Sequence, residues 1–160
     1  MTSYRICAVC SGNICRSPLA EVVLREAFDQ ARLADQVDIC SAGTGAWHVG
    51  DGADSRAITV AYHHGLDLRQ HRSQQVDAAH MERMDLVLAL DSGHLHELRQ
   101  LTQHPQIRLL RSFDAEAVAE DDLDVEDPFY GTRADFTSVY HQLRAAAPGI
   151  VAHVRSQLAG

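Results

Sequence analysis

The sequence predicts an α/β fold in three layers, with a four-stranded parallel sheet that carries helices on both faces. Strand-like apolar segments alternate with helix-like segments along the chain, which is the order typical of parallel α/β folds. The chain has 160 residues, enough for one domain spanning residues 1–160. Apolar residues make up 46% of the sequence and charged residues 22%, as is usual for a globular domain.

Four short apolar segments are expected to form the sheet: residues 4–9, 37–41, 84–90 and 107–110. The third contains the run Leu-Val-Leu-Ala-Leu and is apolar enough to lie in the middle of the sheet.

Helical spacing of apolar residues predicts helices over residues 19–31, 54–64, 92–102 and 133–158. Ser17 and Pro18 have the character of an N-cap and a first helical residue, and Ser92 is a second candidate cap. Gly65 is expected just beyond the end of the second helix. Pro148, followed by a glycine, is expected to interrupt or kink the last helix.

The overall charge and the cysteines limit the possible environments and partners. A net charge of −8 argues against non-specific binding to nucleic acid or to an anionic membrane. We find neither a signal peptide nor an apolar run long enough to span a bilayer, so we expect a cytoplasmic protein. There the four cysteines stay reduced; they are Cys7, Cys10, Cys15 and Cys40.

The turn after the first strand is the first candidate for a functional site. In open parallel sheets, ligands bind at the carboxyl ends of the strands. Residues 10–17 read Cys-Ser-Gly-Asn-Ile-Cys-Arg-Ser and lie between a strand and a helix. Their backbone N–H groups can form an anion-binding nest at the helix N-terminus. Gly12 and Asn13 tolerate the unusual backbone angles that such a cradle needs, and a phosphate group fits it.

Two side chains would turn this cradle into an enzyme. Cys10 faces the N–H donors and the helix N-terminus, which favour a thiolate, and Ser17 can donate a hydrogen bond to it. The planar fork of Arg16 can hold two phosphoryl oxygens at once. Cys7 lies inside the strand and is expected in the core. A zinc site made of these cysteines and Cys15 has the wrong spacing, and no Gly-Lys-Ser/Thr follows to make a Walker loop.

Residues 9–18, Val-Cys-Ser-Gly-Asn-Ile-Cys-Arg-Ser-Pro, resemble the signature of low-molecular-weight protein tyrosine phosphatases. The similarity covers nearly the whole chain and is greatest to bacterial, especially actinobacterial, members; it continues through residues 41–44, 47–50, 54–57 and 127–131. The resemblance implies the four-stranded parallel sheet, tyrosine-phosphorylated proteins as substrates, inorganic phosphate as product, and neither metal nor cofactor.

Hydrolysis of a phosphotyrosine needs an acid, because a phenol is a poor leaving group as its anion. Residues 114–127 offer many carboxylates. Asp127 stands out because Pro128 restricts its backbone, while Phe129 and Tyr130 can desolvate it and favour its protonated form. The Asp-Pro-aromatic motif of the resembled family assigns the same role to Asp127.

The pocket around the cradle is expected to have aromatic walls. These walls are Trp47, Phe129 and Tyr130, with stacking surfaces suited to a phosphorylated ring. The resemblance also implies that a histidine hydrogen-bonds to Asn13. His64 is the candidate and His63 its competitor, while His48 is expected on the surface of a loop. The loop residues expected to contact substrate are Ser11, Gly12, Asn13, Ile14, Cys15 and Ser17.

Three other functions are considered. A protein-arginine phosphatase branch of the same family carries Thr where this chain has Ile14, so the apolar side chain favours phosphotyrosine. Arsenate reduction needs further cysteines in the middle of the chain, and none occurs after Cys40. Against a non-catalytic phosphotyrosine-binding module stands the retention of Cys10, Arg16 and Asp127 together.

Cys15 lies five residues after Cys10 in the same loop. It is predicted to trap an oxidised Cys10 as a disulfide and so to protect it from irreversible oxidation. The alternative is that Cys15 only packs beneath the loop.

Overall fold

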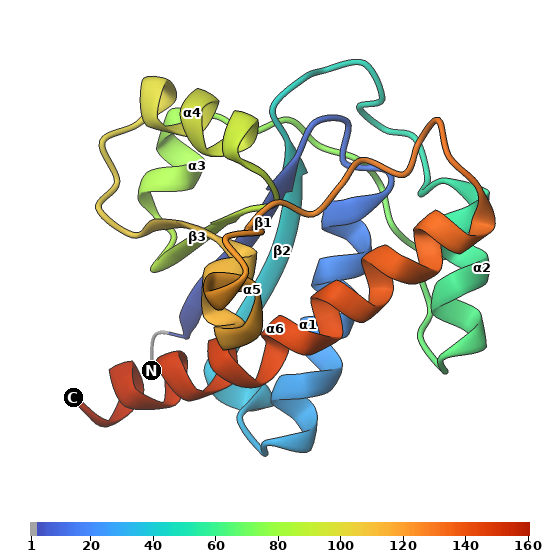
Figure 1. The fold of residues 1–160 in the computed structure, drawn as a ribbon. Coiled ribbons are helices and arrows are strands. Elements are labelled where there is room, and N and C mark those ends of the chain that lie inside the picture. The colour runs from blue at the N-terminus through green and yellow to red at the C-terminus, as the bar shows by residue number, and fades with distance from the viewer. Residues whose placement is uncertain (1–2) are drawn as a thin grey trace.

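The computed structural model describes residues 3–160 and contains one parallel sheet of four strands in the order β2-β1-β3-β4 (Figure 1). The strands are β1 (Tyr4–Cys10), β2 (Val37–Gly43), β3 (Leu86–Ala89) and β4 (Ile107–Leu109). The predicted α/β fold is therefore confirmed.

The two inner strands are almost wholly apolar, because both of their faces are covered. Ile6 pairs with Ile39 of β2 and with Leu86 of β3, and all three are buried. Strands covered on both faces read as continuous apolar runs, as β3 does.

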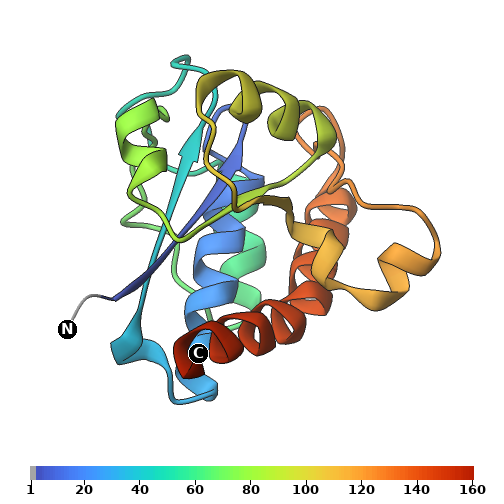
Figure 2. The same ribbon diagram turned by 90° about the vertical axis from the view of Figure 1, so that its left-hand side faces the viewer.

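Helices lie on both faces of the sheet (Figure 2). The core of one face is built from α1, α2 and α6, and that of the other from α3 and α4. The helices are α1 (Arg16–Gln30), α2 (Ser55–His63), α3 (Ala78–Glu82), α4 (Ser92–Leu101), α5 (Ala115–Ala119) and α6 (Arg133–Ala159), with 3-10 turns at Ala34–Gln36 and Leu110–Phe113.

Alternation along β1 supplies both cores. Ile6 and Ala8 belong to the core beneath α1 and α6, whereas Cys7 and Val9 belong to the core beneath α3 and α4. The expected core position of Cys7 is confirmed. Each fully buried large apolar side chain contributes about 1.5–3 kcal/mol relative to an exposed one.

Two details of the predicted helices are wrong. Helix α1 begins at Arg16, so Ser17 lies inside it rather than capping it. Asp91, not Ser92, is the N-cap of α4, and its carboxylate accepts a hydrogen bond from the N–H of His94. At Pro148, where an interruption or a kink was predicted, helix α6 is not interrupted, and Figure 2 shows that it changes direction along its length.

The segment that leads to Asp127 is anchored to the end of β3. It contains α5, which the acidic composition did not suggest. The N–H of the buried Val125 donates to the carbonyl of Leu90 at 2.8 Å. This bond ties the acidic segment to the residue that follows β3, so Asp127 lies near the carboxyl end of the sheet.

Candidate active site

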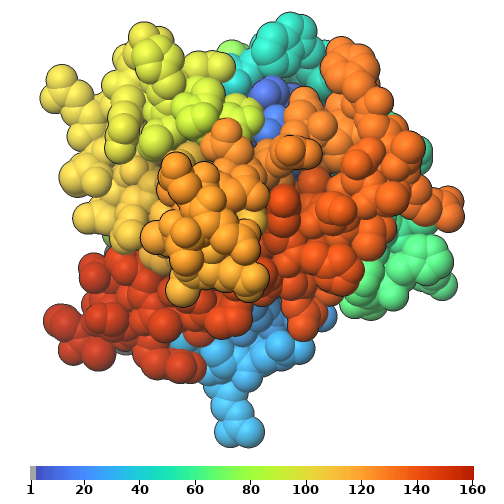
Figure 3. All heavy atoms as spheres, viewed as in Figure 1, coloured from blue at the N-terminus to red at the C-terminus, as the bar shows by residue number. Residues whose placement is uncertain are grey.

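The phosphate loop, residues 10–17, connects β1 to α1 at the carboxyl edge of the sheet. Chain connections from β1 and β3 leave this edge in opposite directions, which is where open α/β sheets bind ligands. Blue atoms of this early part of the chain are visible in a hollow between the cyan, yellow-green and orange surfaces (Figure 3). The cavity there has a volume of about 370 Å³ and is lined by Cys10, Ser11, Gly12, Ile14, Cys15, Arg16, Trp47, His48, Asp127, Phe129 and Tyr130.

The phosphate loop is held in place through its carbonyl oxygens. The carbonyl of Asn13 accepts from the Nε2 of His71 at 2.7 Å and from the Oγ of Ser73 at 2.6 Å. Three other loop carbonyls accept from backbone N–H groups: those of Cys10, Ser11 and Ile14, from Thr44, Gly45 and Asp54 respectively. These bonds fix the loop through its carbonyl oxygens, and the first N–H groups of α1 have no acceptor within the helix, so they can bind an anion.

Asn13 organises the loop from behind. Its φ of 58° is the left-handed conformation expected of it. Its Nδ2 donates to the Oγ of Ser17 at 2.8 Å and to the Oγ of Ser41 at 3.0 Å, while its Oδ1 accepts from the N–H of Gln74 at 3.0 Å. This side chain is fully buried, and all of its polar atoms are satisfied.

Ser17 connects Asn13 to the cysteine. Its Oγ lies 2.9 Å from the Sγ of Cys10 and 3.4 Å from the carbonyl of Ala42. The single hydrogen of this hydroxyl has two acceptors within reach, the Ala42 carbonyl and the sulfur, and the sulfur is the nearer of the two. A donated hydrogen bond favours the charged thiolate.

Arg16 is buried and held by acceptors on its far side. Its NH1 donates to the Oδ2 of Asp91 at 2.7 Å and to the carbonyl of Val125 at 2.9 Å. Burial would raise the pKa of Asp91, but hydrogen bonds from the N–H of His94 and from Arg16 outweigh it, so this pKa is lowered. The ionised carboxylate fixes one edge of the guanidinium, and the NH2 edge lies 3.7 Å from Asp127.

His94 is buried against both the phosphate loop and Arg16. Its Nδ1 accepts from the N–H of Asp91 at 3.2 Å, and its Nε2 lies 2.8 Å from the Oγ of Ser11. Burial and then the charge of Arg16 lower its pKa, which favours the neutral ring. With Nδ1 as an acceptor, the single proton lies on Nε2 and is donated to Ser11.

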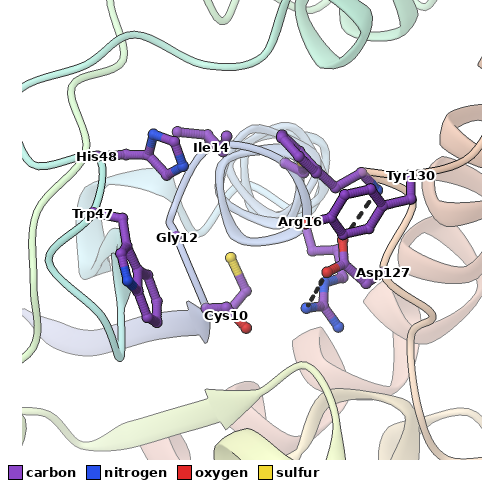
Figure 4. A pocket seen from close by; sticks show the side chains of 11 residues that line it. Cys10, Gly12, Ile14, Arg16, Trp47, His48, Asp127 and Tyr130 are labelled. Atoms are coloured by element: carbon purple, nitrogen blue, oxygen red, sulfur yellow. Dashed lines mark hydrogen bonds and ion pairs between the residues drawn. The ribbon is translucent and has the colours of Figure 1, made fainter.

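Asp127 lies opposite Cys10 at the rim of the cavity (Figure 4). Its Oδ1 accepts from the N–H of Phe129 at 3.1 Å, and its Oδ2 faces Arg16. The expected desolvation by the following aromatic residues is wrong for this structure. The side chain of Asp127 is 49% exposed, and Tyr130 is 93% exposed.

Two exposed aromatic residues stand on opposite sides of Cys10. Figure 4 shows Trp47 on one side of the sulfur and Tyr130 on the other. Trp47 is 74% exposed, and Phe129 packs edge-on against Tyr130 with ring centroids 5.0 Å apart. The cavity is therefore open, with flat apolar walls and an electropositive floor.

The interpretation of His64 as the partner of Asn13 is wrong. His64 stacks on Tyr140 of α6, with ring centroids 3.7 Å apart, and its Nδ1 bonds to the carbonyl of Val60. His71 contacts Asn13 instead, at the carbonyl oxygen. Nothing in the spacing of the ten histidines marked His71, because its contact spans 58 residues.

Of the predicted substrate-contacting residues, Asn13 and Ser17 do not line the cavity. Both side chains are fully buried behind the loop, so they support it rather than face a ligand. His48, expected on a loop surface, lines the cavity beside Gly12. The sequence analysis missed Asp91, although its place two residues after the end of β3, at the carboxyl edge of the sheet, could have indicated it.

Comparison with known proteins places this geometry in context. The family model described as low molecular weight phosphotyrosine protein phosphatase matches residues 5–159. The chain is 48% identical to a low molecular weight protein-tyrosine-phosphatase of Streptomyces coelicolor, over 99% of this chain and 98% of that protein. It is 45% identical to low molecular weight protein-tyrosine phosphatase A of Mycobacterium tuberculosis, over 94% of this chain and 91% of that protein. The predicted resemblance to actinobacterial members is confirmed.

Solved structures of phosphatases superpose closely on this chain. A protein tyrosine phosphatase from Entamoeba histolytica, crystallised with Hepes in its active site, superposes with a TM-score of 0.91 at 28% identity, covering 97% of this chain and 99% of that one. A Drosophila arginine phosphatase superposes with a TM-score of 0.83 at 29% identity, covering 93% and 96%.

Proposed function

The chain belongs to the low-molecular-weight phosphotyrosine protein phosphatases, and from this premise we propose that it hydrolyses phosphotyrosine through a phosphocysteine intermediate on Cys10. The observation that carries the mechanism is the convergence of Cys10, Arg16 and Asp127 on one cavity. A nucleophile, an anion clamp and an acid are the three groups that cleavage of an aryl phosphate needs.

In the first step the Cys10 thiolate attacks phosphorus in line with the phenolic oxygen. The N–H groups of the phosphate loop and the fork of Arg16 hold the equatorial oxygens. Asp127 gives its proton to the departing phenolic oxygen, and the S–P bond replaces the O–P bond. The contact from Ser17 to the sulfur supports this role because it stabilises the nucleophilic form.

In the second step the intermediate is hydrolysed. Asp127, now a carboxylate, takes a proton from a water molecule as that water attacks phosphorus. The S–P bond breaks, inorganic phosphate leaves, and the Cys10 thiolate is restored. Half-exposure of Asp127 supports this step, since water reaches the carboxylate.

Trapping the phosphoenzyme tests the proposal. Mixing the enzyme with a phosphotyrosine peptide and quenching in acid within milliseconds should add one phosphoryl group at Cys10, found by peptide mass spectrometry. Cys10→Ser should show no such group and no turnover while keeping its thermal unfolding temperature. Full activity in Cys10→Ser would refute the mechanism.

Substrate choice is tested by phosphatase assays on phosphotyrosine, phosphoserine and phosphoarginine peptides side by side. Ile14 lines the cavity and supports the preference for an aryl phosphate. Similarity to the Drosophila arginine phosphatase makes phosphoarginine the informative competitor. Faster turnover of the phosphoarginine peptide would replace the tyrosine assignment.

Tyrosine-phosphorylated proteins in the cytoplasm are the proposed substrates. All four cysteines are free thiols, and a thiolate enzyme depends on a reducing compartment. Among residues 3–160 no helix is both long and apolar enough to cross a bilayer. Cell fractionation followed by phosphotyrosine blotting of a strain lacking the enzyme checks both points.

Cys15 is the proposed redox partner of Cys10. Burial raises the pKa of Cys15 well above its usual range, so it stays a thiol and Cys10 is the sulfur that a peroxide oxidises first. Attack of the Cys15 sulfur on a Cys10 sulfenic acid forms the disulfide and releases water. After peroxide and then excess thiol, the wild type should recover several-fold more activity than Cys15→Ser. Cys40→Ser is the control and should recover like the wild type; equal recovery in Cys15→Ser contradicts the proposal.

A further inference from the structure

Arg56, in the first turn of α2, reaches across to the segment that carries Asp127. Its NH2 donates to the carbonyl of Phe129 at 2.9 Å and its NH1 to the carbonyl of Gly131 at 3.3 Å. Figure 1 shows the chain before α6 passing the start of α2. These two carbonyls lie two and four residues after the proposed acid.

The same guanidinium is fixed by Asp54. The Nε of Arg56 donates to Oδ1 at 3.0 Å and its NH2 to Oδ2 at 2.9 Å, a two-pronged pair. The hydrogen bonds from Arg56 outweigh the burial of Asp54 and lower the pKa of Asp54, so the pair stays charged. The guanidinium also lies over the ring of the fully buried Phe136, with 4.5 Å to its centroid. Contacts on several sides therefore leave Arg56 little freedom.

Asp54 extends these contacts to the phosphate loop. Its N–H donates to the carbonyl of Ile14 at 2.9 Å. A continuous strut thus runs from Ile14 through Asp54 and Arg56 to the carbonyls of Phe129 and Gly131. Every link is a hydrogen bond of 2.9 to 3.3 Å.

The acid segment depends on such a link because it has no regular structure around Asp127. Upstream, Val125 is anchored by Leu90 and Arg16. Downstream, the strut is the matching anchor. Asp127 therefore lies between two anchored points: Val125, which is bonded to the residue after β3, and Phe129, which the strut connects to the phosphate loop.

We propose that Arg56, held by Asp54, is a positioning residue that sets the distance between the general acid and the nucleophile. The inference rests on the proposed role of Asp127. A misplacement of about 1 Å can cost about 100-fold in rate, so the strut need shift the segment only slightly to matter. A lysine would keep the charge but not the fork that serves Asp54 and the two carbonyls together.

The chain provides a matched control in Arg69. It makes the same local motif with Asp67, with its N–H on Oδ1 at 2.9 Å, its Nε on Oδ1 at 3.0 Å and its NH2 on Oδ2 at 3.0 Å. That pair is exposed and lies outside the cavity. Comparing Arg56→Gln with Arg69→Gln therefore isolates the link to the acid segment.

The test is the dependence of kcat/KM on the leaving group, because kcat/KM reports the steps up to loss of the phenol and not the later hydrolysis of the phosphocysteine, in which Asp127 also acts. Arg56→Gln should lower kcat/KM about tenfold or more on phenyl phosphate, whose phenol needs a proton, and at most about twofold on a nitrophenyl phosphate. Arg69→Gln should change neither rate, and Arg56→Lys should fall between the wild type and Arg56→Gln. In an Asp127→Ala background, Arg56→Gln should have no further selective effect on phenyl phosphate.

Failure of the strut and failure of the proposed function give different results. If Asp127→Ala lowers kcat/KM equally on both substrates, the acid assignment fails. If Asp127→Ala shows the leaving-group dependence and Arg56→Gln does not, the strut proposal is overturned. An equal loss on both substrates in Arg56→Gln, with a lower unfolding temperature, would also overturn it, because that is the effect of a merely structural contact.

Discussion

His94 is the residue through which acid acts most directly on the phosphate loop. As a neutral ring it accepts from the N–H of Asp91 and donates to Ser11. Protonation would put a hydrogen on Nδ1, 3.1 Å from the Asp91 carboxylate, and a positive charge 3.5 Å from Arg16. The charged ring would then compete with Arg16 for the carboxylate that orients it.

The lowered pKa of His94 predicts a loss of stability in acid. The folded state binds this proton less readily than the unfolded chain, whose histidine has a pKa of about 6.5. The stabilisation is complete above that pH and is lost as pH falls through the lower folded value. Between pH 7.5 and 5, the free energy of unfolding in urea should fall more steeply in the wild type than in His94→Gln.

The control for this pH experiment is His96→Gln, because His96 is an exposed histidine on the same helix. Its unfolding free energy should depend on pH as that of the wild type does. The other charged groups that face His94 are unchanged in both variants; they are Arg16, Asp91, Glu97 and Asp127. Parallel pH profiles for the wild type and His94→Gln would contradict the prediction.

Among the helices, α6 shows how packing overrides local preference. It continues through Pro148, where an interior proline normally breaks a helix. The helix is 27 residues long and buries nine side chains, which hold the residues around the proline in place. Helix α1 shows the same effect at its start, where Cys15 lacks a capping bond because the phosphate loop dictates the entry.

At Gly149, helix α6 passes close to the second 3-10 turn. A Cβ added there would overlap the carbonyl group of Phe113 in the second 3-10 turn. Helix propensity alone would make Gly149→Ala stabilising by about 1 kcal/mol. We expect the overlap to dominate and to lower the free energy of unfolding by about 1–3 kcal/mol, measured by urea titration. A gain in stability would show that α6 can move away without cost.

Over the whole molecule, phosphate binding should report on the assembled site. A ligand that binds only the folded state at 100 times its Kd adds about 2.7 kcal/mol, or roughly 5–10 °C in Tm for a chain of this size. Inorganic phosphate should therefore raise the Tm of the wild type and of Arg69→Gln equally. Arg16→Lys, which lacks the fork, should show a much smaller phosphate-induced shift relative to its own Tm. An undiminished shift in Arg16→Lys would remove Arg16 from anion binding.

The parts of the site that could be predicted from the sequence are those formed by residues adjacent in the chain. The phosphate loop is a single run between a strand and a helix, so its residue types and their order define the cradle, with Asn13 in the left-handed conformation as expected. Asp127, which lines the cavity, stood out in the sequence because Pro128 and two aromatic residues follow it directly. The parallel sheet followed from the alternation of apolar segments, since that pattern depends on the burial of each strand separately.

The parts that required the tertiary structure are contacts between distant segments. His71 rather than His64 reaches Asn13, because the end of α2 turns His64 towards Tyr140. Arg56 and Asp127 are related only through a loop that crosses the start of α2. By itself the sequence therefore determined the fold class and the chemistry of residues 10–17. The position of Asp127 relative to Cys10 was decided by contacts between segments far apart in the sequence, a relation that no local pattern encodes.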